Sequence, residues 1–111
     1  MVYLPTTRSQ RRAEPSHFIQ GEDERIAYVI TTTHWCTNPI NPAVAVYEIA
    51  EDGTRTNVSA AVLSGVPSVV GDDITTPLIE NLEPDKVYRV EVLFECGGNT
   101  LEAFFFIFGE H

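Results

Sequence analysis

Residues 82–92 read LEPDKVYRVEV, and this stretch decides the fold class. In its second half and just beyond, side chains of two kinds alternate along the chain. One face of an extended chain takes Tyr88, Val90, Val92 and Phe94, and the other takes Arg89, Glu91, Leu93 and Glu95. A period of two is typical of a β-strand with one face on a core. We therefore predict a long strand that starts at Val87.

The residues that follow this strand predict a terminal hairpin. Gly97, Gly98 and Asn99 tolerate the positive φ angles that tight hairpin turns require. After the turn, Leu101, Ala103, Phe105 and Ile107 alternate with Glu102, Phe104, Phe106 and Phe108. A single sandwich buries one face of such a strand, so the face with Phe104, Phe106 and Phe108 is a candidate binding surface. Either the arm or a loop of the same chain covers it, or another copy or another protein does.

Upstream of residue 82, short extended segments are separated by turn signals. Strands are predicted over 25–33 and 43–49, weaker ones over 61–63 and 66–70, and a further extended piece over 74–76. Asp52-Gly53 is a strong hairpin signal between two of them. Apolar residues nowhere follow a helical period over a helical length. Short strands with turns every eight to twelve residues or so predict an all-β antiparallel sandwich over residues 17–111.

The first sixteen residues differ from the rest in charge. The chain carries a net charge of −9, yet residues 1–16 hold three arginines against one glutamate. With two prolines and no apolar period, residues 1–16 are predicted to be an extended arm. The arm is either a frayed terminus or a strap that lies on an acidic neighbour. In the second case its contact residues are Tyr3, Leu4, Arg8, Arg11 and Arg12.

Several function classes are disfavoured by composition and motifs. A net charge of −9 repels nucleic acid and anionic membranes, and the longest apolar run, 103–108, is far too short to span a bilayer. The three histidines and five serines form no nucleophile–base pattern, and no phosphate-binding glycine loop is present. Acidic runs at 22–24 and 72–73 lack the spacing of calcium ligands. We expect no enzyme, no metal site and no cofactor.

The segment from Leu82 through Pro84 to Tyr88 resembles the sixth strand of fibronectin type III and related immunoglobulin-like domains. In that family the tyrosine hydroxyl bonds to the backbone upstream and locks the crossover between the two sheets. The resemblance assigns this role to Tyr88. It also implies that Leu82 closes the floor of the sandwich and that Pro84 shapes the turn.

The same resemblance bears on the only two cysteines, Cys36 and Cys96. In immunoglobulin-like sandwiches the strands that precede them face each other across the core, so a disulfide is geometrically feasible. It would close a loop of about 60 residues, worth about 4 kcal/mol in the chain-entropy model. The alternative is two buried thiols, which a bacterial cytosol would keep reduced.

Almost the whole chain also resembles small immunoglobulin-like proteins from the head and neck gene modules of tailed bacteriophages. Elements of that pattern recur from the arm to the final hairpin. The matching residues are Pro5, Gln10, Glu14, Trp35, Thr75, Thr76, Pro77, Ile79, Leu82, Tyr88, Arg89, Val90, Glu91, Val92, Gly97, Gly98, Asn99 and Glu102. The resemblance implies a structural protein of the virion, assembled in the cytoplasm of a bacterial host.

In this interpretation the chain decorates or cements the head, or belongs to the head–tail neck. Its expected partners are the major capsid protein, portal or connector subunits or tail subunits, and further copies of itself in an oligomer or array. The arm and the phenylalanine face would make the contacts. One alternative is a fibronectin-like adhesion or carbohydrate-binding module, for which Trp35 and Tyr47 are the candidate sugar platforms. Another is an assembly factor that does not remain in the particle.

Overall fold

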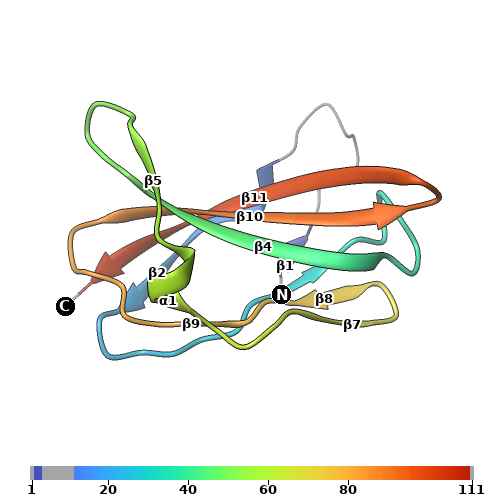
Figure 1. The fold of residues 1–111 in the computed structure, drawn as a ribbon, viewed down its shortest axis with the longest axis horizontal. Helices are drawn as coiled ribbons and strands as arrows, with labels where there is room; N and C mark the ends of the chain where they lie inside the picture. The colour runs from blue at the N-terminus through green and yellow to red at the C-terminus, as the bar shows by residue number, and fades with distance from the viewer. Residues whose placement is uncertain (1, 4–11, 111) are drawn as a thin grey trace.

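The computed structural model describes residues 2–3 and 12–110, and in these residues the chain is an all-β fold with one short helix (Figure 1). In chain order the elements are β1 (Val2–Tyr3), β2 (Arg12–Gly21), β3 (Val29–Thr31), β4 (Ile40–Ile49), β5 (Arg55–Asn57), α1 (Ser59–Val62), β6 (Leu63–Ser64), β7 (Ser68–Val70), β8 (Asp73–Thr75), β9 (Leu78–Ile79), β10 (Val87–Cys96) and β11 (Asn99–Glu110).

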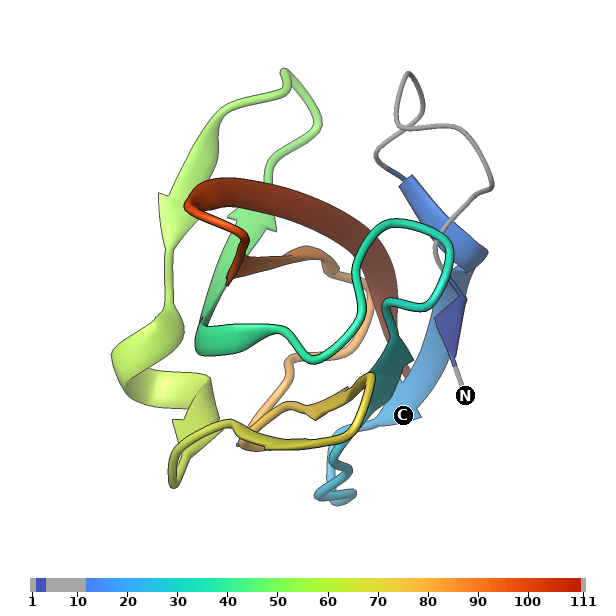
Figure 2. The same ribbon diagram turned by 90° about the vertical axis from the view of Figure 1, so that its right-hand side faces the viewer.

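Within the described ranges, nine of these strands hydrogen-bond in the order β5-β4-β10-β11-β2-β1-β3-β8-β7. The first five form one layer, and β3, β8 and β7 form the other. Strand β2 pairs with β11 on one side and with β1 on the other, so it connects the two layers. Figure 2, which looks along the long axis, shows that the layers curve around a common interior. Strands β6 and β9 pair separately.

The interior is filled by the alternating residues of the terminal hairpin. Tyr88 is 2% exposed, and Phe94 and Phe105 are completely buried. Antiparallel pairing sets Val90 opposite Phe105 and Tyr88 opposite Ile107, so both strands bury the predicted face. The second layer contributes the buried Ile30 and Ile74, and β9 contributes the buried Ile79. The predicted division of β10 and β11 into a core face and an outer face is confirmed.

The structure differs from the sequence-based prediction in several places. Residues 59–62 form α1 and β6 starts only at Leu63, so the strand predicted over 61–63 is wrong. The hydroxyl of Ser59 accepts the Val46 backbone N–H across 2.9 Å, which holds the chain in a turn at this point. Two pairs, β2 with β11 and β1 with β3, are parallel, which a purely antiparallel sandwich does not include. The predicted boundary at residue 16 falls inside β2.

A buried polar cluster fixes the end of β2 to β9 and to the segment that leads into β3. The side chain of Gln20 is fully buried, and its Nε2 donates to the backbone oxygens of Ile79, across 2.8 Å, and of Glu24, across 3.1 Å. Its Oε1 accepts the hydroxyl of Tyr28 across 2.8 Å. Burial, followed by the negative charge of Glu24, raises the pKa of Tyr28 to about 12, so this hydroxyl remains a donor at neutral pH.

Tyr88 connects β10 to the turn that precedes it. Its hydroxyl accepts the backbone N–H of Glu83 across 2.8 Å, five residues upstream. Leu82 beside it is 1% exposed, and Pro84 is half-buried within the same turn. The ring therefore fills the core while its oxygen holds the loop that brings the chain into β10.

Replacing Tyr88 with phenylalanine should lower the free energy of unfolding by about 1–2 kcal/mol, because the Glu83 N–H loses its acceptor while the ring still packs. Urea denaturation of both proteins measures the difference. Tyr47→Phe on the outer surface of β4 is the matched control and should change stability by less than about 0.5 kcal/mol. Equal effects of the two substitutions would contradict a structural role for the Tyr88 hydroxyl.

Candidate interaction surface

The side chains of the five-stranded layer that point away from the core form one continuous surface, which we call the outer face. Pairing across the layer aligns these side chains in rows. The rows are Ile49–Val87–Phe108–Ile19, then Tyr47–Arg89–Phe106–His17, then Ala45–Glu91–Phe104. We call the first of them the apolar row. Strands β4, β10 and β11 are each at least 10 residues long, so the rows rest on a regular sheet rather than on loops.

The apolar row holds two of the exposed large hydrophobic side chains of the described residues. Ile19 is 59% exposed and Phe108 is 39% exposed, and they lie side by side on neighbouring strands. Val87 and Ile49 continue the row across β10 and β4 and are half-buried. Large apolar side chains held next to each other at the surface mark interaction sites more often than scattered ones do.

Aromatic contacts order the phenylalanines of β11. The ring of His17 stacks on Phe108 with centroids 5.1 Å apart, and Phe104 meets Phe106 edge to face at 5.8 Å. The guanidinium carbon of Arg89 lies 3.7 Å from the centre of the Phe104 ring, a cation–π contact. Phe104 and Phe106 are therefore half-buried by neighbours of the same face, and Phe108 is the phenylalanine left most accessible.

Four charged side chains of the outer face form one ion-pair network. The carboxylate of Glu91, whose residue is only 8% exposed, accepts from Arg89 Nε across 2.8 Å and from Arg55 Nη1 across 3.1 Å. Arg89 Nη2 lies 3.9 Å from Glu102 Oε1. Two positive and two negative charges cancel here, whereas the whole chain carries −9. The four charges of this network are thus paired among themselves, while Glu95 and Glu110 add negative charge toward the ends of β10 and β11.

The predicted contact residues of the arm fall partly within the structure. Tyr3 belongs to β1, where its backbone pairs with Glu14 of β2 and with Thr31 of β3. Arg12 is the first residue of β2. Leu4, Arg8 and Arg11 lie outside the described residues. The part of the arm that the structure describes is paired into the sheet.

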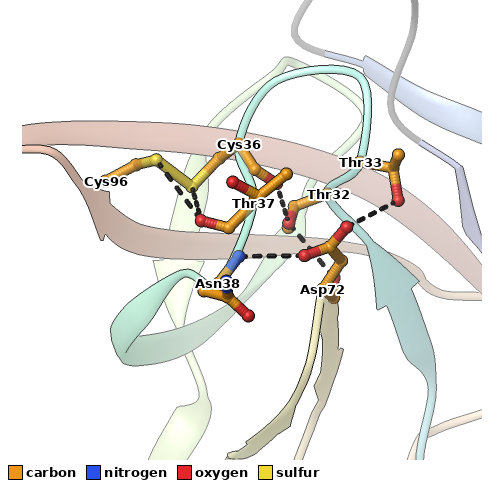
Figure 3. Close-up of a disulfide and its surroundings, with 7 residues drawn as sticks. All are labelled: Thr32, Thr33, Cys36, Thr37, Asn38, Asp72 and Cys96. Carbon is orange, nitrogen blue, oxygen red and sulfur yellow. Dashed lines mark hydrogen bonds between the residues drawn. A yellow bond between two sulfur atoms is a disulfide. The ribbon is translucent and has the colours of Figure 1, made fainter.

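The two cysteines are joined in the structure. The Cys36–Cys96 disulfide has a Cα–Cα distance of 6.1 Å and links the loop after β3 to the end of β10 (Figure 3). Of the two alternatives, bridge or buried thiols, the structure contains the bridge. The disulfide connects the two layers at the end of the molecule that carries the β10–β11 turn.

Asp72 organises the same loop, a role that the sequence pattern did not predict. Its carboxylate accepts the Asn38 backbone N–H across 2.9 Å and the Thr33 hydroxyl across 3.1 Å. The buried Thr32 hydroxyl bonds to the backbone oxygens of Cys36 and Asp72 (Figure 3). The loop after β3 is therefore fixed by hydrogen bonds to the β7–β8 turn as well as by the disulfide.

Ile19 and His17 also escaped prediction, since no strand was expected over residues 17–21. The sequence gives only a weak indication of a strand here, because Phe18 and Gln20 alternate with His17 and Ile19. The apolar–polar contrast is blurred, since the inward residue Gln20 is polar and the outward residue Ile19 is apolar.

Trp35 packs against Phe94 with ring centroids 6.4 Å apart and is half-buried, so it does not form an open platform.

Over residues 2–3 and 12–110, no group of three or more His, Cys, Asp or Glu side chains is arranged to hold a metal ion. Two open depressions lie near Glu22 and Asn81, and mainly charged and amide side chains line them. None of the helices in this part of the chain is long and apolar enough to cross a membrane.

Comparisons with known proteins were made at three levels. No family model matches the chain, no curated protein matches it, and no solved structure matches it. The outer face is therefore interpreted from its own geometry.

Proposed function

We propose that this chain is a non-enzymatic structural subunit that binds neighbouring protein subunits through its outer face. The observation that carries the proposal is the apolar row, in which Phe108 and Ile19 stand accessible on a regular five-stranded layer. Sheet faces that combine accessible apolar side chains with paired charges suit protein–protein contact. A substrate pocket would instead need a concave apolar cavity with converging polar groups.

Three further features support a subunit whose work is mechanical. The disulfide and the hydrogen bonds of Asp72 brace one end of the molecule, and Tyr88 braces the other. A body of this kind holds its binding face in a fixed shape, so little conformational entropy is lost when it docks. The hydroxyl bond of Tyr88 and the two packed layers also support an immunoglobulin-like, fibronectin type III-like sandwich as the finer description of the fold.

The more specific form of the proposal places the chain in the particle of a tailed bacteriophage, as a head decoration or cementing protein or as a neck component. Its support is the sequence resemblance that runs from Pro5 to Glu102. Its partners would be capsid, connector or tail subunits. The basic residues Arg8, Arg11 and Arg12 would add a second contact, and two linked contacts bind more tightly than either alone. The half-buried position of Trp35 makes a carbohydrate-binding module the weaker candidate.

Incorporation into purified particles tests this proposal. Mass spectrometry of particles made with the wild-type chain should detect the protein. The double variant Ile19→Glu/Phe108→Glu should reduce its abundance by at least about tenfold, because two charges would have to be buried against the neighbour. The double variant Val66→Glu/Val70→Glu is the matched control. It adds the same charge at two valines that are 82% and 79% exposed in and beside β7, outside the outer face, and should incorporate normally.

Two outcomes would contradict the proposal. Absence of the wild-type chain from purified particles would remove the virion role and favour a transient assembly factor. Normal incorporation of the outer-face variant would show that this surface does not dock.

A further inference from the structure

The backbone of Cys36 is held in place by hydrogen bonds that do not involve its sulfur atom. Its N–H donates to the backbone oxygen of Thr32 across 2.8 Å, and its own backbone oxygen accepts the Thr32 hydroxyl across 2.8 Å (Figure 3). Thr32 is in turn anchored to the second layer, because its N–H donates to the backbone oxygen of Asp72 across 2.9 Å. The position of Cys36 is therefore set by Thr32 and Asp72 as well as by the disulfide.

The sheet fixes Cys96 in the same way. Cys96 is the last residue of β10, and its backbone pairs with Asn99 across the terminal hairpin. Two residues earlier, the fully buried Phe94 packs against the ring of Trp35, the residue before Cys36. Breaking the sulfur–sulfur bond removes one contact between the loop and β10 and leaves these others intact. The two thiols of a reduced chain therefore still face each other in the folded body.

The two sulfur-bearing residues differ in their access to solvent. Cys36 is 5% exposed, whereas Cys96 is half-buried and is followed by the exposed Gly97 and Gly98 of the hairpin turn. Thiol–disulfide exchange requires direct approach to the sulfur that reacts, so access selects the site of attack. A small reagent from solvent meets Cys96 first.

We propose that Cys96 is a thiol–disulfide exchange site of the folded protein, with Cys36 as its resolving thiol and a small-molecule disulfide such as oxidised glutathione as the oxidant. The Cys96 thiolate attacks one sulfur of the oxidant, which forms a mixed disulfide and releases one small thiolate. The Cys36 thiolate then attacks the Cys96 sulfur, which forms the Cys36–Cys96 bond and releases the second.

The two steps balance. Two protein thiols are oxidised, one small disulfide is reduced to two thiols, and the protons of the protein thiols pass through solvent to the released thiolates. The chain can therefore fold in a reducing compartment and be cross-linked afterwards, when it meets an oxidising one. This inference goes beyond the proposed function and does not depend on it.

The effective concentration of one thiol at the other measures how well the fold prepares the site. In an unfolded chain, two thiols with a sequence separation of 60 meet at an effective concentration on the order of 1 mM. The entropy of closing a loop of that length corresponds to about a 1,000-fold increase when the fold already holds the ends together. We therefore expect an effective concentration on the order of 1 M in the folded protein.

Equilibration of the reduced full chain with mixtures of reduced and oxidised glutathione tests this expectation. Acid quenching followed by mass spectrometry gives the oxidised fraction, in buffer and in denaturing urea. Asp72→Ala should lower the effective concentration in buffer by about tenfold, because it removes the carboxylate that accepts from Asn38 and Thr33. Asp23→Ala is the matched control, since it removes the same charge at an exposed turn beyond β2 and should have no effect.

Single-cysteine variants test which sulfur is the entry site. In the folded state, Cys36→Ser, which keeps Cys96, should form the mixed disulfide with oxidised glutathione at least about ten times faster than Cys96→Ser, which keeps Cys36. In denaturing urea the two variants should react at equal rates, so that any difference in buffer reports the fold. Near-ultraviolet circular dichroism verifies that both variants and the reduced wild type are folded.

Any of four results would overturn the inference. The first is an effective concentration that is the same in buffer and in urea, and the second is equal reactivity of the two single-cysteine variants in buffer. The third is an equal effect of Asp72→Ala and Asp23→Ala. The fourth is a wild-type chain that loses its near-ultraviolet signal on reduction, because oxidation would then have to precede folding.

Discussion

Gly109→Ala is expected to lower the free energy of unfolding by about 3 kcal/mol, one of the two largest effects of a small change in this chain. A Cβ at Gly109 would overlap the backbone oxygen of Glu83 and lie 3.1 Å from its carbonyl carbon. Neither strand nor turn can move away easily. The Gly109 N–H donates to the Lys86 oxygen across 2.9 Å, and the Asp85 N–H donates to the Gly109 oxygen across 3.1 Å. Urea denaturation measures the loss.

Gly21→Ala is the matched control for this substitution. A Cβ there would meet only the flexible side chain of Glu24, with Oε1 at 3.1 Å, so the cost should stay below about 1 kcal/mol. Neither glycine has a positive φ, so alanine causes no backbone strain at either position. The difference in stability between the two variants therefore measures the steric overlap at Gly109. If the two alanine variants were equally stable, the close approach of β11 to the 83–86 turn would be refuted.

Removing the disulfide with Cys36→Ala/Cys96→Ala is the second prediction, with an expected loss of about 4 kcal/mol. The bridge spans a sequence separation of 60, and opening a loop of that length restores roughly this much conformational freedom to the unfolded chain. Domains of this size have a total stability of about 5–15 kcal/mol, so the variant should be far easier to unfold. Denaturant titration under non-reducing conditions gives the difference.

Wild-type protein treated with a thiol reductant is the control, since it keeps both sulfur atoms and loses only the cross-link. It should lose nearly as much stability as the alanine variant. A reduced protein as stable as the oxidised one would mean that packing, and not the cross-link, accounts for any loss in the alanine variant.

The terminal hairpin could be predicted because its information is local. In β10 and β11 each inward residue is two positions from the next, so the alternation along the chain is enough to show which residues share a face. The same reasoning placed Phe104, Phe106 and Phe108 together on one surface. It could not rank them, because their exposure depends on His17 and Arg89, which reach them across neighbouring strands.

Strand β2 escaped the same reasoning for a physical cause. Its inward side chain Gln20 is polar, and it can be buried only because Ile79, 59 residues away, offers a backbone oxygen. Parallel pairing with β11 joins opposite ends of the sequence, so no local pattern signals it. Ile19 therefore entered the candidate surface only with the structure. The hydrogen bonds by which Asp72 holds the loop after β3 are likewise long-range contacts, since Asn38 is 34 residues away.

The parallel pairing of β2 with β11 has a consequence under tension. The two strands run in the same direction, with His17 to Gly21 beside Phe106 to Glu110. A force that pulls the start of β2 away from the end of β11 slides one strand along the other and strains all of their hydrogen bonds together, instead of opening them one at a time. The β2–β11 pair is therefore suited to carrying load along the direction of its strands.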